Sequence, residues 1–335
     1  MDTVSVPRHH VAVATGVDRI PLRGGRGMNM RIAHFSDLHL LSLDGVPMRR
    51  FLNKRLTGWA NLRFKRGHIH RASHVRAIAR AIADAGVDHV VVTGDFTNLA
   101  LESEFELARD VLVQDLGVDP DRVTVVPGNH DVYTRGAMTS RRFEMYFSDW
   151  LESDLPELAV DTAASARFPV VKLRGHAAIV SLSSAVPRLP LVAAGELGRA
   201  QLDALARVLA HPEVARRTLV LALHHPAVQD GWSTLKTHLD GLRDAPELLS
   251  LLMPLSRGLV LHGHLHRRIQ RILTTTEGTV HHVGATSASL HDERDDRMAG
   301  FNVYELDEQG VKRIESRVCD PATGAFAPAS VPKYV

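Results

Sequence analysis

The chain has 335 residues, of which 44% are hydrophobic and 23% are charged, and its formal net charge is +2. These values are typical of a soluble globular protein, and they exclude disorder along the whole length and a fibrous repeat. The single cysteine, Cys319, excludes an internal disulfide and a thiolate metal cluster built within one chain.

The N-terminal residues 1–29 show no sustained hydrophobic period and end in a Gly/Arg-rich run, so we expect a disordered extension. Charged and polar residues interrupt any apolar core of a signal peptide, and no apolar run approaches the ~18 residues of a membrane span. We therefore expect a cytoplasmic protein.

The first half of the globular part alternates strands with helices. We expect strands at 32–36, 90–92 and 123–126, and between them helices whose apolar residues fall on one face. One helix carries Val75, Ile78 and Ile82, and the other carries Phe105 and Leu112. This β-α-β-α-β order predicts a parallel sheet with right-handed crossovers.

The second half is richer in strands, which we expect at 170–173, 178–182, 219–223, 259–261, 268–273, 280–283, 301–306 and 311–316, with a helix around 202–209. The predicted fold class is therefore α/β, as a four-layer α/β/β/α sandwich of two mixed sheets flanked by helices. We expect one domain over residues 30–318, a basic insertion or cap at 44–74 and a C-terminal tail at 319–335.

Ligand-type side chains follow five of the predicted strands. They occur in D-x-H (37–39), G-D (94–95), G-N-H-D (128–131), H-H-P (224–226) and G-H-x-H (263–266). Open α/β sheets place their sites at the carboxyl ends of strands, so these residues should converge. Carboxylate, imidazole and amide ligands without thiolate suit divalent ions such as Mn²⁺, Fe²⁺, Zn²⁺ or Mg²⁺.

Seven ligands are too many for one tetrahedral ion, and the natural division is two ions that share one carboxylate. Two ions about 3.5–4 Å apart can hold the attacking and leaving oxygens of an in-line displacement at phosphorus. A water between them would be acidified to hydroxide. The pattern therefore predicts a hydrolase of phosphate esters.

The ordered set of five motifs resembles the calcineurin-like metallophosphoesterase family, and the resemblance spans Asp37 to His266. It implies two divalent metal ions. One would be held by Asp37, His39, Asp95 and His266, and the other by Asp95, Asn129, His224 and His264, so that Asp95 is the bridge. The ions would be Mn²⁺, Fe²⁺ or Zn²⁺.

The same resemblance implies two catalytic residues. His130 would face the phosphate, stabilise its developing charge and protonate the leaving oxygen, a role that suits an imidazole with an unperturbed pKa near 6.5. Asp131 would orient or charge-pair His130. Histidines 225, 262, 281 and 282 lie in or beside predicted strands, where hydrogen-bonded structural roles are expected, although His262 could orient a ligand.

Gly195-Glu196-Leu197, followed by Gln201-Leu202, is similar to the small bacterial phosphodiesterases that act on cyclic nucleotides and glycerophosphodiesters. Ala227 departs from their second proline, and Leu40-Leu41 departs from the glycine common after the first histidine motif. The resemblance thus implies a phosphodiesterase that prefers cyclic nucleotides, through in-line attack of a metal-bridging hydroxide and without a covalent enzyme intermediate.

Residues 44–76 contain nine Lys or Arg against one acid, Asp44, a local charge of +8 in a chain of net charge +2. The apolar residues of this stretch fall within one half of a helical wheel. One interpretation is an ordinary helix with a solvated basic back. The other is a cap that contacts substrate phosphate or an anionic membrane surface, which would place the protein at the inner membrane surface.

Two alternatives to the small-molecule phosphodiesterase remain. One is hydrolysis of a lipid-linked or nucleotide-sugar pyrophosphate or phosphodiester at the membrane surface, and the other is a non-catalytic interaction scaffold on the same fold. Nucleic acid is disfavoured as a partner, since the sequence shows no broad basic surface. A homo-oligomer stays open.

Overall fold

The structure, a computed structural model, describes residues 29–42, 70–132, 134–162, 166–189, 192–320 and 322–333. The expected N-terminal extension and nearly all of the basic insertion lie outside these ranges. Helix α2 begins at Ala72, so the last residues assigned to the insertion belong to that helix. None of the helices in the described ranges combines the length and apolarity needed to cross a lipid bilayer.

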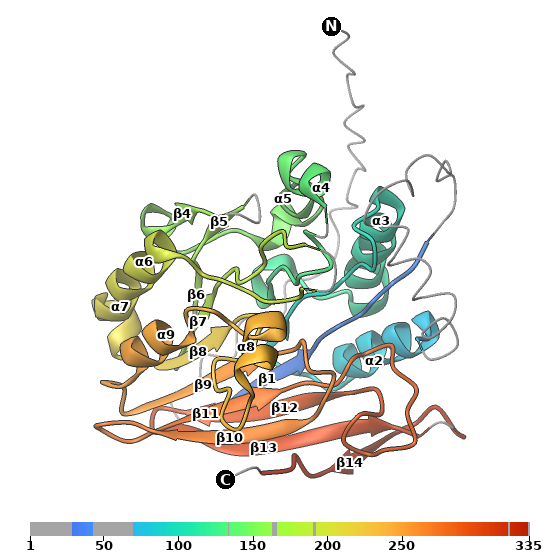
Figure 1. Cartoon of the computed structure of the whole chain (residues 1–335). Coiled ribbons are helices and arrows are strands. Elements are labelled where there is room, and N and C mark those ends of the chain that lie inside the picture. The colour runs from blue at the N-terminus through green and yellow to red at the C-terminus, as the bar shows by residue number, and fades with distance from the viewer. Residues whose placement is uncertain are drawn as a thin grey trace, which may run out of the picture.

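Two six-stranded mixed sheets make up the centre of the described fold, as expected (Figure 1). The first has the order β14-β13-β12-β1-β2-β3, and the second has the order β10-β11-β9-β8-β7-β6. The strands of the first sheet are β1 (Met30–Phe35), β2 (His89–Val92), β3 (Val123–Val125), β12 (Gly300–Asp307), β13 (Gly310–Cys319) and β14 (Phe326–Ala329). Those of the second are β6 (Val170–Arg174), β7 (Ala177–Ser181), β8 (Thr218–Ala222), β9 (Arg257–His262), β10 (Ile269–Thr274) and β11 (Thr279–Gly284). A short ribbon joins β4 (Val160–Asp161) to β5 (Arg167–Phe168).

The helices cover the outer faces of the two sheets, which gives the four layers that the sequence predicts (Figure 1). The first sheet is covered by α2 (Ala72–Asp84), α3 (Glu102–Asp110), the π-helical turn η3 (Val111–Leu116) and α5 (Arg142–Phe147). The second is covered by α6 (Arg199–Ala210) and α9 (Ala245–Leu252). The other helices are α4 (Arg135–Thr139), α7 (Pro212–Ala215), α8 (Thr234–Asp240) and the 3₁₀ turns η4 (Pro120–Arg122), η5 (Ser148–Trp150) and η6 (Pro156–Leu158).

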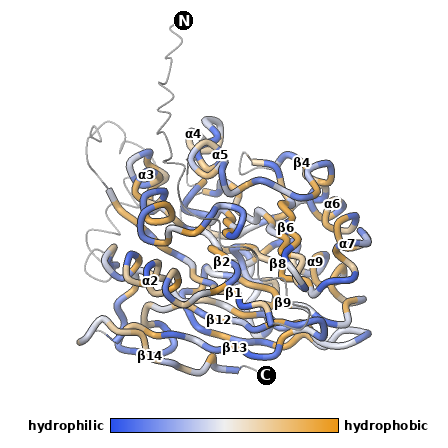
Figure 2. Tube along the Cα trace, turned by 180° about the vertical axis from the view of Figure 1, so that it is seen from behind, coloured by the Kyte–Doolittle hydropathy of each residue, from blue (hydrophilic) through white to orange (hydrophobic). Residues whose placement is uncertain are grey.

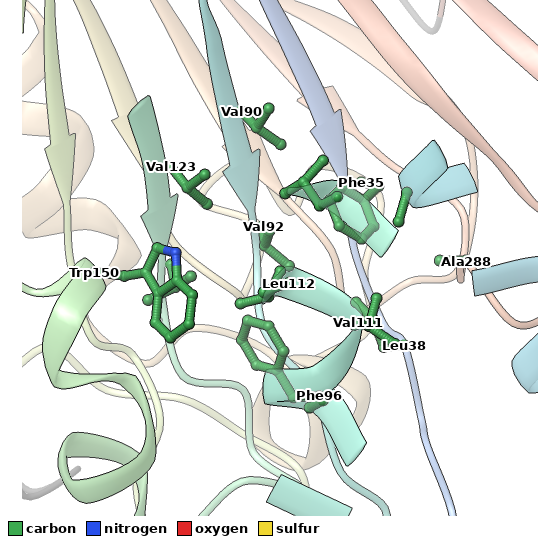
Figure 3. Close-up of a cluster of buried hydrophobic side chains, with 14 of the residues drawn as sticks. Phe35, Leu38, Val90, Val92, Phe96, Val111, Leu112, Val123, Trp150 and Ala288 are labelled. Carbon is green, nitrogen blue, oxygen red and sulfur yellow. The ribbon is translucent and has the colours of Figure 1, made fainter. Parts of the chain in front are cut away.

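The alternation along β2 shows how these layers are built. Val90 and Val92 belong to the cluster on the helix side, where Val92 lies beside Leu112 (Figure 3), whereas Val91 faces the second sheet. A strand buried on both faces needs an unbroken apolar run, which is what the sequence has here. Figure 2 shows the same contrast, with hydrophobic central strands and a largely hydrophilic β13 at the rim.

The parallel pairing predicted for the first half is present, because β2 pairs in parallel with both β1 and β3. Two details differ from the expectation. The second predicted helix is α3 followed by the π-helical turn η3, which ends at Gly117 with φ +60°. The residues beyond 318, expected as a tail, extend the first sheet, since β14 pairs antiparallel with β13.

Candidate metal centre

The ends of five strands bring the predicted site residues to one place. Asp37 follows β1, Asp95 follows β2 and Asn129 follows β3, all from the first sheet. His224 follows β8 and the pair His264 and His266 follows β9, both from the second sheet. The site therefore lies where the carboxyl ends of the parallel strands of both sheets meet.

The backbone at these strand ends has an uncommon conformation. Five of the expected ligands have positive φ: Asp37 (53°), His39 (45°), Asp95 (53°), His264 (66°) and His266 (49°). Such left-handed conformations are disfavoured for residues with a side chain and cluster at functional sites. Backbone hydrogen bonds hold them, including Asp37 N–H to the Gly94 carbonyl at 2.9 Å and His39 N–H to the Asp95 carbonyl at 2.9 Å.

One cluster of ligand atoms consists of Asp37, His39 and His266. Nε2 of His266 lies 3.2 Å from Oδ1 of Asp37 and 3.0 Å from Nε2 of His39. When two nitrogens bind the same ion, each at about 2.1 Å, they stand roughly 3 Å apart. The spacing of these side chains therefore suits a shared metal ion.

The second cluster consists of Asn129, His224 and His264. Oδ1 of Asn129 lies 3.1 Å from Nε2 of His224 and 3.2 Å from Nδ1 of His264. The opposite ring nitrogens are fixed by backbone carbonyls, with Nδ1 of His224 donating to Thr93 at 2.7 Å and Nε2 of His264 donating to Asp240 at 2.9 Å. Such bonds set the tautomer and aim the free nitrogen of each ring at the site.

Asp95 lies between the two clusters. Its Oδ2 is 3.8 Å from Nε2 of His39 in the first cluster and 3.4 Å from Nε2 of His224 in the second. Gly128 makes room for it, since a Cβ at that position would lie 2.1 Å from Oδ1 of Asp95. The carboxylate is thus placed to bridge two ions.

Electrostatics favour a cation at this place. Burial tends to raise the pKa of Asp95, but the imidazoles of His224 and His130 lower it well below its usual value. Burial tends to lower the pKa of His224, but Asp95 raises it to about 9. In the protein without metal, a proton on His224 therefore balances the carboxylate, and metal binding would release that proton.

The chemistry of the donors fits the implied metals. Asp37 and Asp95 are both buried, with at most 2% of their surface exposed, and buried carboxylates require cationic partners. Burial and the charge of His224 lower the pKa of His264 to about 3, which keeps its ring in the neutral, ligating form. The seven residues could therefore hold two divalent ions.

His130 lies at the edge of the first cluster, with its ring centroid 5.0 Å from that of His39. Its Nδ1 donates to the carbonyl of Asn98 at 2.8 Å, and its backbone N–H donates to Oδ1 of Asp95 at 2.8 Å. The carbonyl thus fixes the proton on Nδ1, which leaves Nε2 as the ring nitrogen that can change its protonation.

The carboxylate of Asp131 accepts hydrogen bonds mainly from backbone N–H groups. Its carboxylate accepts hydrogen bonds from the N–H groups of Gly128 at 2.9 Å and Thr97 at 3.0 Å, and from Oγ1 of Thr97 at 3.0 Å. Burial and the charge of Asp95 raise the pKa of Asp131 to about 7, against the lowering effect of these donors. The residue ties the loop after β3 to the loop after β2.

Three of the other histidines have the hydrogen bonds expected of structural residues. His225 contacts Oγ of Ser184 at 2.8 Å and the carbonyl of Ala193 at 2.7 Å. Nδ1 of His262 contacts the carbonyl of Gly263 at 3.0 Å, and Nδ1 of His281 contacts Gln270 at 3.0 Å. His282 differs, because neither of its buried ring nitrogens has a partner among the described residues.

His70 joins the site without having been predicted. Its ring centroid lies 5.1 Å from that of His39 and 6.1 Å from that of His266, and its Nδ1 contacts Oγ of Ser289 at 2.7 Å. A backbone bridge to Leu290 brings it there. Its position 31 residues after His39, within the basic insertion, gives no strand-end signal that could have identified it.

Comparisons with known proteins identify the family and the fold. Residues 30–268 match the family model of the calcineurin-like phosphoesterases. A dimetal phosphatase from Danio rerio shares the fold with 16% identity and a TM-score of 0.52, over 90% of this chain and 99% of that chain. A purple acid phosphatase from yellow lupin (Lupinus luteus) seeds has 12% identity and a TM-score of 0.53, over 89% of this chain and 52% of that chain.

The search of curated protein sequences found no significant match. The family model nevertheless covers more than two thirds of the chain, including all five motifs. The chain belongs to the calcineurin-like phosphoesterase family, whose members are metal-dependent phosphoester hydrolases.

Proposed function

We propose that this protein is a binuclear metal-dependent phosphodiesterase that hydrolyses small phosphodiesters, with cyclic nucleotides preferred. The observation that carries the proposal is the place of Asp95, whose Oδ2 lies 3.8 Å from the His39 ring and 3.4 Å from the His224 ring, between two clusters of ligand atoms. Two ions that share a carboxylate form the arrangement that serves displacement at phosphorus.

We assign Asp37, His39, Asp95 and His266 to one ion and Asp95, Asn129, His224 and His264 to the other. When bound, the ions supply positive charge for the phosphate oxygens and lower the pKa of a coordinated water. The protein supplies the geometry. Backbone carbonyls orient the two histidines of the second cluster. Positive φ angles set the directions of Asp37 and His39 in the segment that follows β1.

His130 is the proposed proton donor to the leaving oxygen. The bond from its Nδ1 to the carbonyl of Asn98 holds one proton in place, so that the imidazolium delivers the proton on Nε2 and returns to the neutral ring. Asp131 is better assigned to positioning the loops around Asp95 than to charge-pairing His130, because its carboxylate is occupied by the backbone of Gly128 and Thr97.

The preference for cyclic nucleotides rests on the motif around Gly195 and Gln201, whose residues support the site from behind. A Cβ at Gly195 would lie 2.4 Å from Nδ1 of His225. The amide of Gln201 bonds to both N–H and carbonyl of Ser183, at the end of the strand beside β8. Gly195 leaves room for His225, and Gln201 holds the segment that precedes Ser184, whose Oγ contacts His225 at 2.8 Å. Substrate choice itself would be made by loops in front of this pair.

The test is Mn²⁺-dependent hydrolysis of an aryl phosphodiester beside the matching aryl phosphomonoester. Wild type should hydrolyse the diester, and the kcat/KM of Asn129→Ala should be lower by on the order of 100-fold or more. Losing a metal ligand should cost at least as much activity as losing a residue that only orients a metal ligand. Gln114→Ala, an exposed amide on η3, is the matched control and should behave as wild type.

A panel of cyclic nucleotides, glycerophosphodiesters and nucleotide-sugar pyrophosphates would then test the substrate class. Preference for a lipid-linked substrate, together with vesicle binding, would favour the membrane-surface alternative. Two bound metal ions with no activity on any ester would favour the interaction scaffold.

A further inference from the structure

A second pocket, of about 320 Å³, lies behind the loop that carries His264 and His266. We call it the rear pocket. Its walls come from the segment after His225, from helix α8 (at the front of Figure 1), from β10 and β11, and from the loop before β12. Among the described residues that line it are none of the seven expected ligands and not His130, so it is a separate space.

Strand register explains why polar side chains meet on its floor. Arg271 on β10 is paired with His282 on β11, and His282 is paired with Val260 on β9, so the three side chains share one row on one face of the sheet. Val260 packs in the apolar core beneath α6 and α9. The same face therefore changes from apolar under the helices to polar at its edge.

The lining carries an excess of positive charge. Lys236, Arg267, Arg271 and Arg297 contribute four cations against one lining acid, Asp230. Arg267 is paired with Asp296 outside the lining, and NH1 of Arg271 is 3.9 Å from a carboxylate oxygen of Asp230. With Asp296 counted, the lining keeps a net charge of +2, and Asp292 acts on Arg297 from outside the lining.

His282 is a buried polar residue of the lining. Its side chain is buried, with 2% of the residue exposed, it lines the rear pocket, and neither ring nitrogen has a hydrogen-bond partner among the described residues. Buried polar groups are almost always paired, so this imidazole is unusual, but both of its nitrogens are themselves covered and a ligand would reach them only if the surrounding side chains moved.

An aromatic ring completes the pocket. The Trp232 indole lines it, and Nζ of Lys236 sits 4.2 Å from the ring centroid. Guanidinium groups recognise phosphate through paired N–H donors, and an indole offers a flat apolar surface on which a planar ring can stack. The volume lies within the range of small-ligand sites.

We propose that the rear pocket binds a phosphomonoester that bears a flat aromatic ring, such as a nucleoside monophosphate, as a ligand separate from the substrate at the metal centre. Arg271 and Arg297 hold the phosphate, and Trp232 stacks on the ring. Leu265 and Arg267 of the lining alternate with His264 and His266, so an occupied pocket steadies the loop that holds two metal ligands. This proposal does not depend on the preferred substrate.

The experiment is a titration of the Mn²⁺-loaded full chain with adenosine 5′-monophosphate, followed by tryptophan fluorescence and by calorimetry. We expect a saturable fluorescence change that is lost in Trp232→Phe. The double variant Arg271→Gln/Arg297→Gln should raise Kd at least 10-fold. Arg199→Gln, which removes a charge from the exposed surface of α6, is the matched control and should leave Kd unchanged.

Further measurements separate this site from the metal centre. Binding should persist in Asp95→Asn, adenosine should fail to bind, and inorganic phosphate should bind more weakly than the nucleotide. Unchanged Mn²⁺ content and melting temperature would show that the double variant is folded. Loss of binding in Asp95→Asn, an unchanged Kd in the folded double variant, or no binding by wild type at millimolar nucleotide would each overturn the proposal.

Discussion

Oδ2 of Asp95 lies 3.4 Å from Nε2 of His224. This contact connects the end of a strand in the first sheet to the end of a strand in the second. Neither sheet holds a complete ligand set, since Asp37, Asp95 and Asn129 come from one and the three histidines 224, 264 and 266 from the other. A metal ion bound here would therefore connect the two halves of the sandwich, so metal binding and global stability should be coupled.

Asp95→Asn tests this coupling. The amide keeps the shape of the carboxylate but loses its charge, so a bridged pair of ions should not form. Elemental analysis should therefore show a metal content of about one equivalent or fewer, compared with about two in the wild type. The thermal midpoint in excess Mn²⁺ should also fall towards that of the metal-free protein. Asp203→Asn, at an exposed ion pair on α6, should keep both values, and two retained ions in Asp95→Asn would refute the bridge.

Gly263→Ala tests how closely the second-sheet loop approaches the first sheet. A Cβ at this position would lie 2.0 Å from Oγ of Ser36 and 2.4 Å from Oδ2 of Asp37, both in the strand-end segment of β1. The loop must then move outwards, and His264 and His266 with it. We expect a loss of Mn²⁺ affinity of at least 10-fold in a competition titration.

The control for that substitution is Gly136→Ala in α4, where the nearest atom to the added Cβ is Oγ1 of Thr134 at 3.9 Å. Alanine in a helix is favoured over glycine, so this variant should be as stable as wild type or slightly more stable. Equal Mn²⁺ affinity in both glycine variants would show that the loop tolerates displacement.

The layered fold and the convergence of the five motifs were predictable because they rest on local patterns. Apolar runs such as Val90–Val92 identify strands buried on both faces, and a ligand residue just after such a run must lie at the strand end. The helix over Val75 to Ile82 follows from its spacing, and the structure buries the same residues.

Other features were not predictable because they depend on contacts between distant segments. His70 reaches the site through a bridge to Leu290, 220 positions away. Strand β14 has a weak apolar pattern and forms because β13 extends to Cys319 and offers an edge. The partners of Asp131 are backbone groups of two loops, which a sequence motif does not specify.

His70→Ala tests whether this unpredicted imidazole takes part in the reaction. Its ring faces His39 and His266 from outside their ligand cluster, where it can donate to a bound phosphate group. We expect kcat to fall roughly 10-fold or more while the Mn²⁺ content stays at the wild-type value. Steady-state kinetics with the diester and elemental analysis on the same preparations would check both.

Ser289→Ala should give a smaller loss of kcat, because it keeps the His70 ring and removes the 2.7 Å contact that orients it, together with a 3.1 Å contact to Oγ of Ser287. His176→Ala, remote from the site near Glu308, should leave kcat unchanged. If His70→Ala loses metal in proportion to activity, the residue supports the metal cluster and does not act on substrate.

A buried histidine between the sheets should make the fold sensitive to acid. His34 on β1 is fully buried, with Nδ1 3.0 Å from the Tyr304 hydroxyl and Nε2 2.8 Å from Oγ1 of Thr93. Burial and the nearby His262 lower its pKa from 6.5 to about 3, although Asp37 opposes the shift. The folded protein thus keeps this ring neutral at pH values where the unfolded chain binds a proton.

Because the unfolded state takes up the additional proton, the free energy of unfolding should fall as pH decreases from about 6.5 towards 3. The loss is about 1.4 kcal/mol per pH unit, or about 2 kcal/mol between pH 7.5 and pH 5. His34→Gln should flatten this slope by the same amount, measured by urea unfolding in saturating Mn²⁺ at both pH values. Gln114→Ala, which removes no titratable group from the exposed surface of η3, is the control and should keep the wild-type slope. Equal slopes for His34→Gln and wild type would mean that another group carries the acid sensitivity.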